Sequence, residues 1–289
     1  MVVFPNCKIN LGLNVVRKRP DGFHDIETVF YPLKLVDALE IIENNSSQDD
    51  ILFSNSGIDL GISAHDNLCV RAYKLVKEDF QHLPPIKMHL HKMISVGAGL
   101  GGGSADAAFT LKLLNTKFNL GLSTEKLLDY ALQLGSDCPF FILNKSCFAS
   151  GRGELLEEII VDLSSFKFIS IDPGININTA WAFSLVTSHQ PIKSTKAIIR
   201  QPPETWRNEL KNDFEEIVFK EHPQLKTLKN NFYKMGAVFC SMSGTGSHIY
   251  ALFKKDFIPD IGLLYQDFTI SDSNIKNFRV IHSPTESIL

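Results

Sequence analysis

A dense run of glycines between residues 97 and 103 constrains this chain more than any other feature. The run reads Gly-Ala-Gly-Leu-Gly-Gly-Gly and continues into Ser104 and an alanine-rich segment. Because glycine loses much conformational entropy on folding, this density indicates a backbone that approaches something closely or adopts positive φ. Unpaired N–H groups at a helix start bind anions without a basic side chain. The run therefore predicts a loop that binds a phosphorylated ligand, in preference to a flexible linker.

Three well-known glycine loops can be compared with this one. Gly97, Gly99 and Gly102 fit the dinucleotide pattern G-x-G-x-x-G, but the helix expected at residues 104–114 is followed by a second helical pattern instead of a strand. A Walker loop has lysine where this chain has Gly103, and the protein-kinase motifs V-A-I-K, H-R-D and D-F-G do not follow. The loop is instead similar to that of the superfamily of galactokinase, homoserine kinase, mevalonate kinase and phosphomevalonate kinase.

Composition and charge narrow the class of protein. The chain has 289 residues, of which 44% are hydrophobic and 21% charged, as in a soluble globular protein of one large or two ordinary domains. Its net charge of -3 and dispersed Lys and Arg favour a small-molecule ligand over nucleic acid. Five scattered cysteines without a C-x-x-C pair predict reduced thiols in a cytosolic compartment. His89 and His91 alternate with apolar residues, which favours outward strand positions over a metal site.

The first half of the chain shows clear periodic patterns. Residues 7–15 alternate as a half-buried strand, so Lys8 and Asn10 are expected on one face. Asp137 is expected in a helix-to-strand connector, between a helix that ends at Gly135 and the apolar run at 140–143, because Pro139 forbids further helix. The other expected elements are a strand around 28–31, a helix capped by Asp66 or Asn67, a strand at 86–91 and a helix capped by Ser123 or Thr124.

Beyond residue 158 the pattern restarts, which predicts a second α+β domain. We expect a strand at 166–171, a capped helix from Asn178, a helix at 225–235, and strands at 237–240 and 248–253 around a loop at 243–247. No signal peptide or membrane-spanning segment is recognised, and a strand is expected within the first ten residues. The lack of an extension before it favours a bacterial cytoplasmic enzyme over a plastid precursor.

Several motifs in order along the chain resemble one family, that of 4-diphosphocytidyl-2-C-methyl-D-erythritol kinase in the GHMP kinase superfamily. Its members act in the non-mevalonate pathway of isoprenoid biosynthesis. Such an ordered set is far more specific than any single motif. The motifs are Lys8-x-Asn10, Gly22-Phe23-His24, the loop 97–104, Leu134-Gly135-Ser136-Asp137-Cys138-Pro139 and Ser243-Gly244-Thr245-Gly246, with smaller matches at Asp66-Asn67-Leu68, Gly151-x-Gly153-Glu154 and Asn212-Asp213.

The resemblance implies a fold, a domain division and a reaction. It implies an α+β protein with an N-terminal domain of the ribosomal S5 domain 2 type, a ferredoxin-like C-terminal domain and an active site in the cleft between them. We expect the domains at residues 1–155 and 156–289, with the last strand free to return to the first domain. The implied reaction moves the γ-phosphoryl group of ATP, with Mg²⁺ on the phosphates, to the tertiary 2-hydroxyl of the methylerythritol moiety. Metal ligands and oligomeric state are not predicted.

The resemblance also assigns catalytic residues. A tertiary alcohol is a weak nucleophile, so a carboxylate must orient it and take its proton, and Asp137 matches that base. Lys8 matches the ammonium that keeps this carboxylate ionised and stabilises charge on the reacting oxygens. Asn10 would position the substrate. In isolation, Asp137 is equally well explained as a turn former and Lys8 as an exposed strand lysine.

Ligand-binding residues follow from the same match. The cytosine ring would stack between Phe23 and Phe183, with polar contacts from His24 and Thr179. Phe23 departs from the Tyr that is frequent in the family, and Ser95-Val96 replaces a common Pro before the loop. Ser104 can cap its helix and also touch phosphate or the metal. Lys92 matches a nucleotide-binding position but also fits a solvated strand-end lysine. The full ATP-binding set is Asn67, Lys92, Ser95, Val96, Gly97, Ala98, Gly99, Leu100, Gly101, Gly102, Gly103, Ser104 and Ala105.

Three alternatives remain open on the sequence. Homoserine or mevalonate kinase shares the glycine loop and the Gly-Thr-Gly loop, although Gly-Phe-His and the region of Phe183 favour a cytidine-bearing substrate. A kinase fold kept as a metabolite sensor would not need both Lys8 and Asp137. A nicotinamide oxidoreductase is the most distant alternative, and NADH binding would test it. The expected partner is a small molecule, without nucleic acid or membrane.

Overall fold

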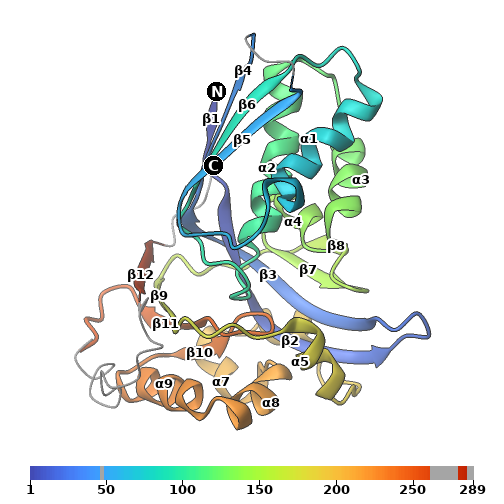
Figure 1. Cartoon of the computed structure of the whole chain (residues 1–289). Helices are drawn as coiled ribbons and strands as arrows, with labels where there is room; N and C mark the ends of the chain where they lie inside the picture. The colour runs from blue at the N-terminus through green and yellow to red at the C-terminus, as the bar shows by residue number, and fades with distance from the viewer. Residues whose placement is uncertain (46–48, 261–278, 285–289) are drawn as a thin grey trace. The chain divides into compact units, whose positions relative to one another are not determined.

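The computed structural model describes residues 1–45 and 49–260, together with the backbone of residues 279–284 (Figure 1). The chain divides into two compact units, and the division falls within the glycine run, after Leu100. The predicted domain boundary between residues 155 and 156 stays a prediction. The first unit comprises Met1–Cys7, Leu35–Val96 and Gly101–Lys145, and the second comprises Lys8–Lys34, Gly97–Leu100 and Ser146–Leu289.

A four-stranded sheet and a group of helices make up the first unit. The sheet order is β1 (Val2–Val3), β4 (Ala38–Glu43), β6 (Ile86–Lys92) and β5 (Ile51–Gly57), with β5 parallel to β6 and the other pairs antiparallel. Ile86, Met88 and Leu90 are buried whereas Lys87 and His91 are exposed, as the predicted alternation requires. Beside this sheet pack α1 (Leu68–Asp79), α2 (Gly102–Lys117), α3 (Thr124–Leu134) and α4 (Cys138–Leu143), with the 3₁₀ turn η1 (Ala64–Asp66) before α1 (Figure 1).

Side-chain caps fix the starts of two of these helices. Asn67 Oδ1 accepts a hydrogen bond from the Cys69 N–H at 2.8 Å, so α1 begins directly after Asn67. The Ser123 hydroxyl accepts from the Lys126 N–H at 3.3 Å at the start of α3. Gly135 ends α3. The expected caps and helices are confirmed.

The segment after Gly135 corrects one expectation. The sequence predicts a connector and then an apolar run at 140–143, but α4 occupies Cys138–Leu143 with Pro139 in its first turn. Proline is accepted there because first-turn N–H groups have no intrahelical partner and its fixed φ suits a helix. Asp137 therefore lies immediately before a short helix, not before a strand.

Within the residues that the structure describes, the second unit contains two further sheets. One has the order β2 (Asn6–Lys18), β3 (His24–Val36), β7 (Cys147–Ser150) and β8 (Leu155–Glu158), although β2 and β3 each reach a few residues into the first unit. The other is antiparallel throughout, with the order β10 (Phe239–Met242), β11 (Ile249–Lys254), β9 (Phe166–Asp172) and β12 (Arg279–Pro284). The helical segments are α5 (Thr179–Leu185), α6 (Thr195–Ile199), η2 (Pro203–Thr205), α7 (Trp206–Glu209), α8 (Phe214–Glu221) and α9 (Pro223–Lys234).

A shared core joins strands and helices of this unit. Val15, Ile169, Phe214, Phe232 and Ala251 are fully buried members of one apolar cluster, so β2, β9, β11, α8 and α9 pack together. The predicted strands around the loop 243–247 and the predicted helix at 225–235 are confirmed. The α+β class is also confirmed. Among the helices of the described ranges, none combines the length and apolar character needed to cross a membrane.

Candidate active site

The backbone of the glycine loop has the shape that its composition predicts. Gly97, Gly99 and Gly101 have φ of 72°, 80° and 70°, and they alternate with Ala98 and Leu100, which do not adopt positive φ. This is a region that side-chain-bearing L-residues rarely occupy. Alternation of this kind directs successive N–H groups to one side and forms a concave anion-binding nest. The loop then passes into α2 with Gly101 at its N-cap position and no side-chain cap.

Residues 97–100 are held by backbone and hydroxyl contacts of the second unit. The Ser243 hydroxyl donates to the Gly99 carbonyl at 2.8 Å, and a Cβ placed on Gly99 would lie 1.9 Å from the Ser243 carbonyl oxygen. The His248 N–H donates to the Ala98 carbonyl at 3.3 Å, and the Lys8 N–H donates to the Leu100 carbonyl at 2.9 Å. Only glycine fits at position 99, so the loop 243–247 fixes the backbone of the glycine loop.

Lys8 and Asn10 lie together, as their place in one strand predicts. The Lys8 ammonium donates to Asn10 Oδ1 at 2.6 Å and lies 4.8 Å from the centre of the Phe30 ring. Asn10 Nδ2 donates to the Thr28 hydroxyl at 3.0 Å, and the Asn10 N–H donates to the Ser243 hydroxyl at 3.2 Å. Lys8 is 4% exposed, so its interpretation as an exposed strand lysine is wrong. These contacts hold its ammonium in one position.

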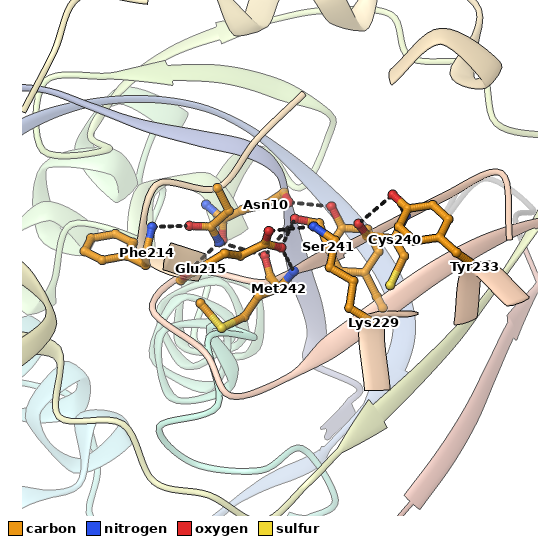
Figure 2. Close-up of polar contacts among 11 residues, drawn as sticks. Asn10, Phe214, Glu215, Lys229, Tyr233, Cys240, Ser241 and Met242 are labelled. Carbon is orange, nitrogen blue, oxygen red and sulfur yellow. Dashed lines mark hydrogen bonds and ion pairs between the residues drawn. The ribbon is translucent and has the colours of Figure 1, made fainter. Parts of the chain in front are cut away.

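Glu215, Ser241 and Met242 belong to a polar network at the base of the loop 243–247 (Figure 2). Asn212 Nδ2 donates to the carbonyls of Met242 and Gly244, both at 2.8 Å. Glu215 accepts from the Met242 N–H at 2.9 Å and the Ser241 hydroxyl at 3.0 Å, and its other oxygen pairs with Lys229 at 2.5 Å. The sequence motifs include Asn212 and Ser243 without a role, and Glu215 is missed entirely. Its position three residues after Asn212, at the start of a helix, is the only signal for it.

The predicted cytidine-binding residues are only partly adjacent. The rings of His24 and Phe183 have their centres 5.1 Å apart, tilted by 30°. Phe23 is 52% exposed and lies under the Arg152 guanidinium, 4.5 Å from its ring centre. The Thr179 hydroxyl faces the Thr245 hydroxyl at 3.4 Å. Partial burial, together with the positive charge of Lys18, lowers the pKa of His24, which leaves a neutral ring at pH 7 able to donate and accept hydrogen bonds.

In the first unit, the start of α2 presents a half-exposed surface. Gly101, Gly103 and Ser104 are partly exposed. Ala105 is fully buried, as Ala98 nearly is in the second unit, so any contact that either makes with a ligand is through the backbone. Ser95 is half-buried and Val96 exposed; Asn67 is buried and already engaged as the cap of α1.

Lys92 is not a solvated lysine. Its side chain is 0% exposed, its Nζ lies 2.7 Å from Asp106 Oδ2, and it also pairs with Asp37. Burial alone would lower the pKa of Lys92, but the two carboxylates outweigh it and raise the pKa, so the ammonium stays charged. Burial raises the pKa of Asp106, although the charge of Lys92 opposes this shift. Asp37 and Asp106 are not among the predicted site residues, whereas Lys92 continues the buried alternation of Ile86, Met88 and Leu90, which signals an inward side chain.

Asp137 is half-buried and lies directly before α4, with backbone angles of -84° and -16°. It belongs to the first unit and Lys8 to the second. The roles of both residues, and of the ligand-binding set, stay predictions.

Comparisons with known proteins identify the family. Residues 67–145 match the profile of the GHMP kinases N terminal domain, and residues 194–259 match that of the GHMP kinases C terminal domain. The 4-diphosphocytidyl-2-C-methyl-D-erythritol kinase of Bacteroides fragilis is 48% identical over 256 residues, covering 89% of this chain and 93% of that protein. The enzyme of the same name from Cytophaga hutchinsonii is 46% identical over 254 residues, covering 88% and 92%.

A solved structure gives the same result. The crystal structure of a 4-(cytidine 5'-diphospho)-2C-methyl-D-erythritol kinase superposes with a TM-score of 0.76 at 30% identity, covering 87% of this chain and 90% of the other. The expected GHMP kinase architecture is thereby confirmed, and the chain belongs to the 4-diphosphocytidyl-2-C-methyl-D-erythritol kinase family.

Proposed function

We propose that this protein is a small-molecule kinase that transfers the γ-phosphoryl group of ATP to the 2-hydroxyl of 4-diphosphocytidyl-2-C-methyl-D-erythritol. The observation that carries the proposal is the 48% identity to a kinase of that name over 89% of the chain. The product would enter the non-mevalonate route to isoprenoid precursors. A cytoplasmic location is part of the proposal, and five buried cysteines without disulfides agree with a reducing compartment.

The glycine loop supplies the ATP site in this proposal. Its positive-φ glycines create a nest of N–H groups, and the first turn of α2 adds the unpaired N–H groups of a helix start. Mg²⁺ prefers oxygen ligands and is usually held by substrate phosphates with one or two protein groups. The half-exposed Ser104 hydroxyl is an oxygen ligand in the first turn of α2, the end of the helix at which the phosphates are proposed to bind. Bound there with the phosphates, Mg²⁺ would neutralise part of their charge.

Asp137 takes the role of the base. The bond between the γ-phosphorus and the substrate oxygen forms as the bond from the γ-phosphorus to the bridging oxygen of ADP breaks, and the hydroxyl proton passes to Asp137. Lys8 supplies a fixed ammonium for the charge that develops on the transferred oxygens. Its hydrogen bond to Asn10 at 2.6 Å supports this role, because a preorganised charge needs no reorganisation during the reaction.

The cytosine base would bind near Phe183 and His24. Their rings already lie 5.1 Å apart, so a stacking surface and a polar edge are present together. Thr179 adds a hydroxyl at the start of α5. Phe23, although a phenylalanine where the family often has tyrosine, keeps an exposed aromatic face for stacking.

A direct assay tests the proposed function. The purified protein is incubated with ATP, Mg²⁺ and 4-diphosphocytidyl-2-C-methyl-D-erythritol, and phosphorus NMR follows the new phosphate ester and ADP. We expect a phosphorylated product from this substrate, and none from homoserine or mevalonate at the same concentration. ATP-dependent turnover of homoserine or mevalonate in place of the cytidylated substrate would refute the substrate assignment, and no turnover of any of them would refute the kinase activity.

A further inference from the structure

Three buried charged side chains cluster near the start of α2, and the proposed phosphoryl-transfer step uses none of them directly. Lys92 ends β6, Asp37 directly precedes β4, and Asp106 belongs to the second turn of α2. The Lys92 ammonium pairs with both carboxylates, and the exposed fractions of the three side chains are 0%, 0% and 4%. Charges buried this deeply are costly unless they are paired, so the cluster holds its members in fixed positions.

Each carboxylate holds a different part of the phosphate-binding segment. Asp37 Oδ1 accepts the N–H groups of Met93 at 2.6 Å and Ile94 at 2.8 Å, the residues that lead into the glycine loop. Asp106 is one helical turn beyond Gly102, the first residue of α2. Through Lys92, the cluster therefore ties the strand that precedes the loop to the helix that follows it.

Gly102 rests directly on this cluster. A Cβ placed on Gly102 would lie 3.0 Å from Lys92 Nζ and 2.7 Å from Ile94 Cγ2. The backbone of Lys92 is itself fixed, because its carbonyl accepts the Ile58 N–H at 2.9 Å and would lie 2.2 Å from a Cβ on Gly57. The first residue of α2 therefore packs against a lysine whose backbone is fixed in β6. The N–H groups at the start of α2 cannot shift without moving β6.

We propose that Lys92, Asp37 and Asp106 form a positioning unit that sets the first turn of α2 for ATP, and that Lys92 acts on ATP through this unit and not by contact. The proposal rests on the proposed function of the loop. Asp106 Oδ1 is buried and, within the described residues, has no hydrogen-bond partner. An unfilled acceptor is unfavourable, so the arrangement is not the one that stability alone would select.

Nucleotide affinity tests the proposal. Isothermal titration with the Mg²⁺ complex of the non-hydrolysable ATP analogue AMPPNP gives Kd, and initial rates give KM for ATP and for the cytidylated substrate. We expect Lys92→Met and Asp106→Leu to raise Kd and the ATP KM at least tenfold, with the KM of the other substrate unchanged. Asp106→Asn keeps an oxygen acceptor for Lys92 and should stay within about threefold of wild type. Lys87→Met, an exposed lysine of the same strand, is the matched control and should change neither value.

A double-mutant cycle separates positioning from contact. If Lys92 acts through Asp37, Asp37→Leu, which removes the acceptor, weakens AMPPNP binding by itself, and the double variant with Lys92→Met is little weaker than Lys92→Met alone. Wild-type affinity in Asp37→Leu together with a large loss in Lys92→Met would overturn the proposal in favour of direct contact. Wild-type affinity in Lys92→Met would overturn it outright. Should Lys92→Met fail to fold by circular dichroism, the Asp106→Leu and Asp106→Asn pair decides: equal affinity of the two overturns it.

A purely structural role predicts a different result. General destabilisation lowers the active fraction, and hence kcat, without moving the KM for ATP alone. Binding of AMPPNP does not require the alcohol substrate. Failure of the substrate assignment would therefore leave this test intact, and failure of this test would leave the wild-type assay unaffected.

Discussion

Residues 97–100 of the glycine loop are held by neutral hydrogen bonds, whereas the start of α2 is held by buried charges. The carbonyls of Ala98, Gly99 and Leu100 each accept one hydrogen bond from a backbone N–H or a hydroxyl. Gly102, by contrast, rests on Lys92 and its two carboxylates. Each neutral hydrogen bond contributes about 1 kcal/mol to stability and can be lost without affecting the others. In a buried ion cluster, removing one member leaves an uncompensated buried charge, so the whole cluster is destabilised.

The proposed base, Asp137, lies outside both residues 97–100 and the start of α2. Its substitution should therefore change catalysis without changing nucleotide binding, and it serves as the reference for the variants below. Asp137→Asn removes the acceptor of the substrate proton and should lower kcat by about 10² to 10⁴-fold. The Kd for the AMPPNP complex should stay within about twofold of wild type, since neither support of the loop is altered. Single-turnover rates and titration calorimetry measure the two quantities. Unchanged turnover would remove Asp137 as the base.

The charged support should show the largest effect on stability. Lys92→Met leaves two carboxylates buried without their cation and should lower the free energy of unfolding by about 3–5 kcal/mol. Urea denaturation followed by circular dichroism measures this, with Lys87→Met as the control, for which less than about 0.5 kcal/mol is expected. A loss below 1 kcal/mol would mean that the ion cluster contributes no more to stability than one neutral hydrogen bond at residues 97–100.

The difference between the halves also decides what the sequence could predict. The glycine run, the caps Asn67 and Ser123 and the strand of Lys8 and Asn10 are local patterns, and the structure confirms them. Asp37 is far from Lys92 in sequence, and their pairing depends on the register of β4 beside β6, which no local pattern reveals.

One local rule was applied too strictly. Pro139 predicts the end of the helical pattern, but proline is favoured in a first turn, and the apolar residues after it are those of α4. Phosphate binding by the loop could be predicted from its glycines, but the catalytic roles and the cytidine-binding roles could be drawn from the resemblance only, because they depend on a ligand that no periodicity encodes.

Among the residues that hold residues 97–100 in place, His248 makes this support sensitive to pH. Its N–H donates to the Ala98 carbonyl, and its imidazole is buried. Burial lowers the pKa of His248 to about 4, although the charge of Asp172 opposes the shift, and its Nδ1 has no hydrogen-bond partner in the described part of the chain. The unfolded chain takes up this proton as pH falls below about 6.5, whereas the folded protein does not until about pH 4. The unfolded state therefore binds more protons in this window, and stability falls as pH falls.

We expect His248 to account for up to about 3 kcal/mol of the stability lost between pH 6.5 and pH 4. Urea denaturation of wild type and His248→Gln across this range measures it as a difference in slope. His91→Gln, an exposed histidine of β6, controls for the general effect of acid. Equal pH dependence of the unfolding free energy in wild type and His248→Gln would show that His248 does not make the support of residues 97–100 sensitive to acid.

The smallest expected effect belongs to the Ser243 hydroxyl, which joins Gly99 to Asn10. Ser243→Ala removes the donor to the Gly99 carbonyl and the acceptor of the Asn10 N–H, while the packing that excludes a side chain at Gly99 remains. The loss in unfolding free energy should therefore be about 1 kcal/mol, and Kd for the AMPPNP complex should rise by less than about tenfold. Ser184→Ala, which removes an exposed hydroxyl bonded to the Trp181 carbonyl, is the control. If Ser243→Ala weakened AMPPNP binding as much as Lys92→Met, hydrogen bonds and buried charges would fix the two halves equally, because a single neutral hydroxyl would then match three charges.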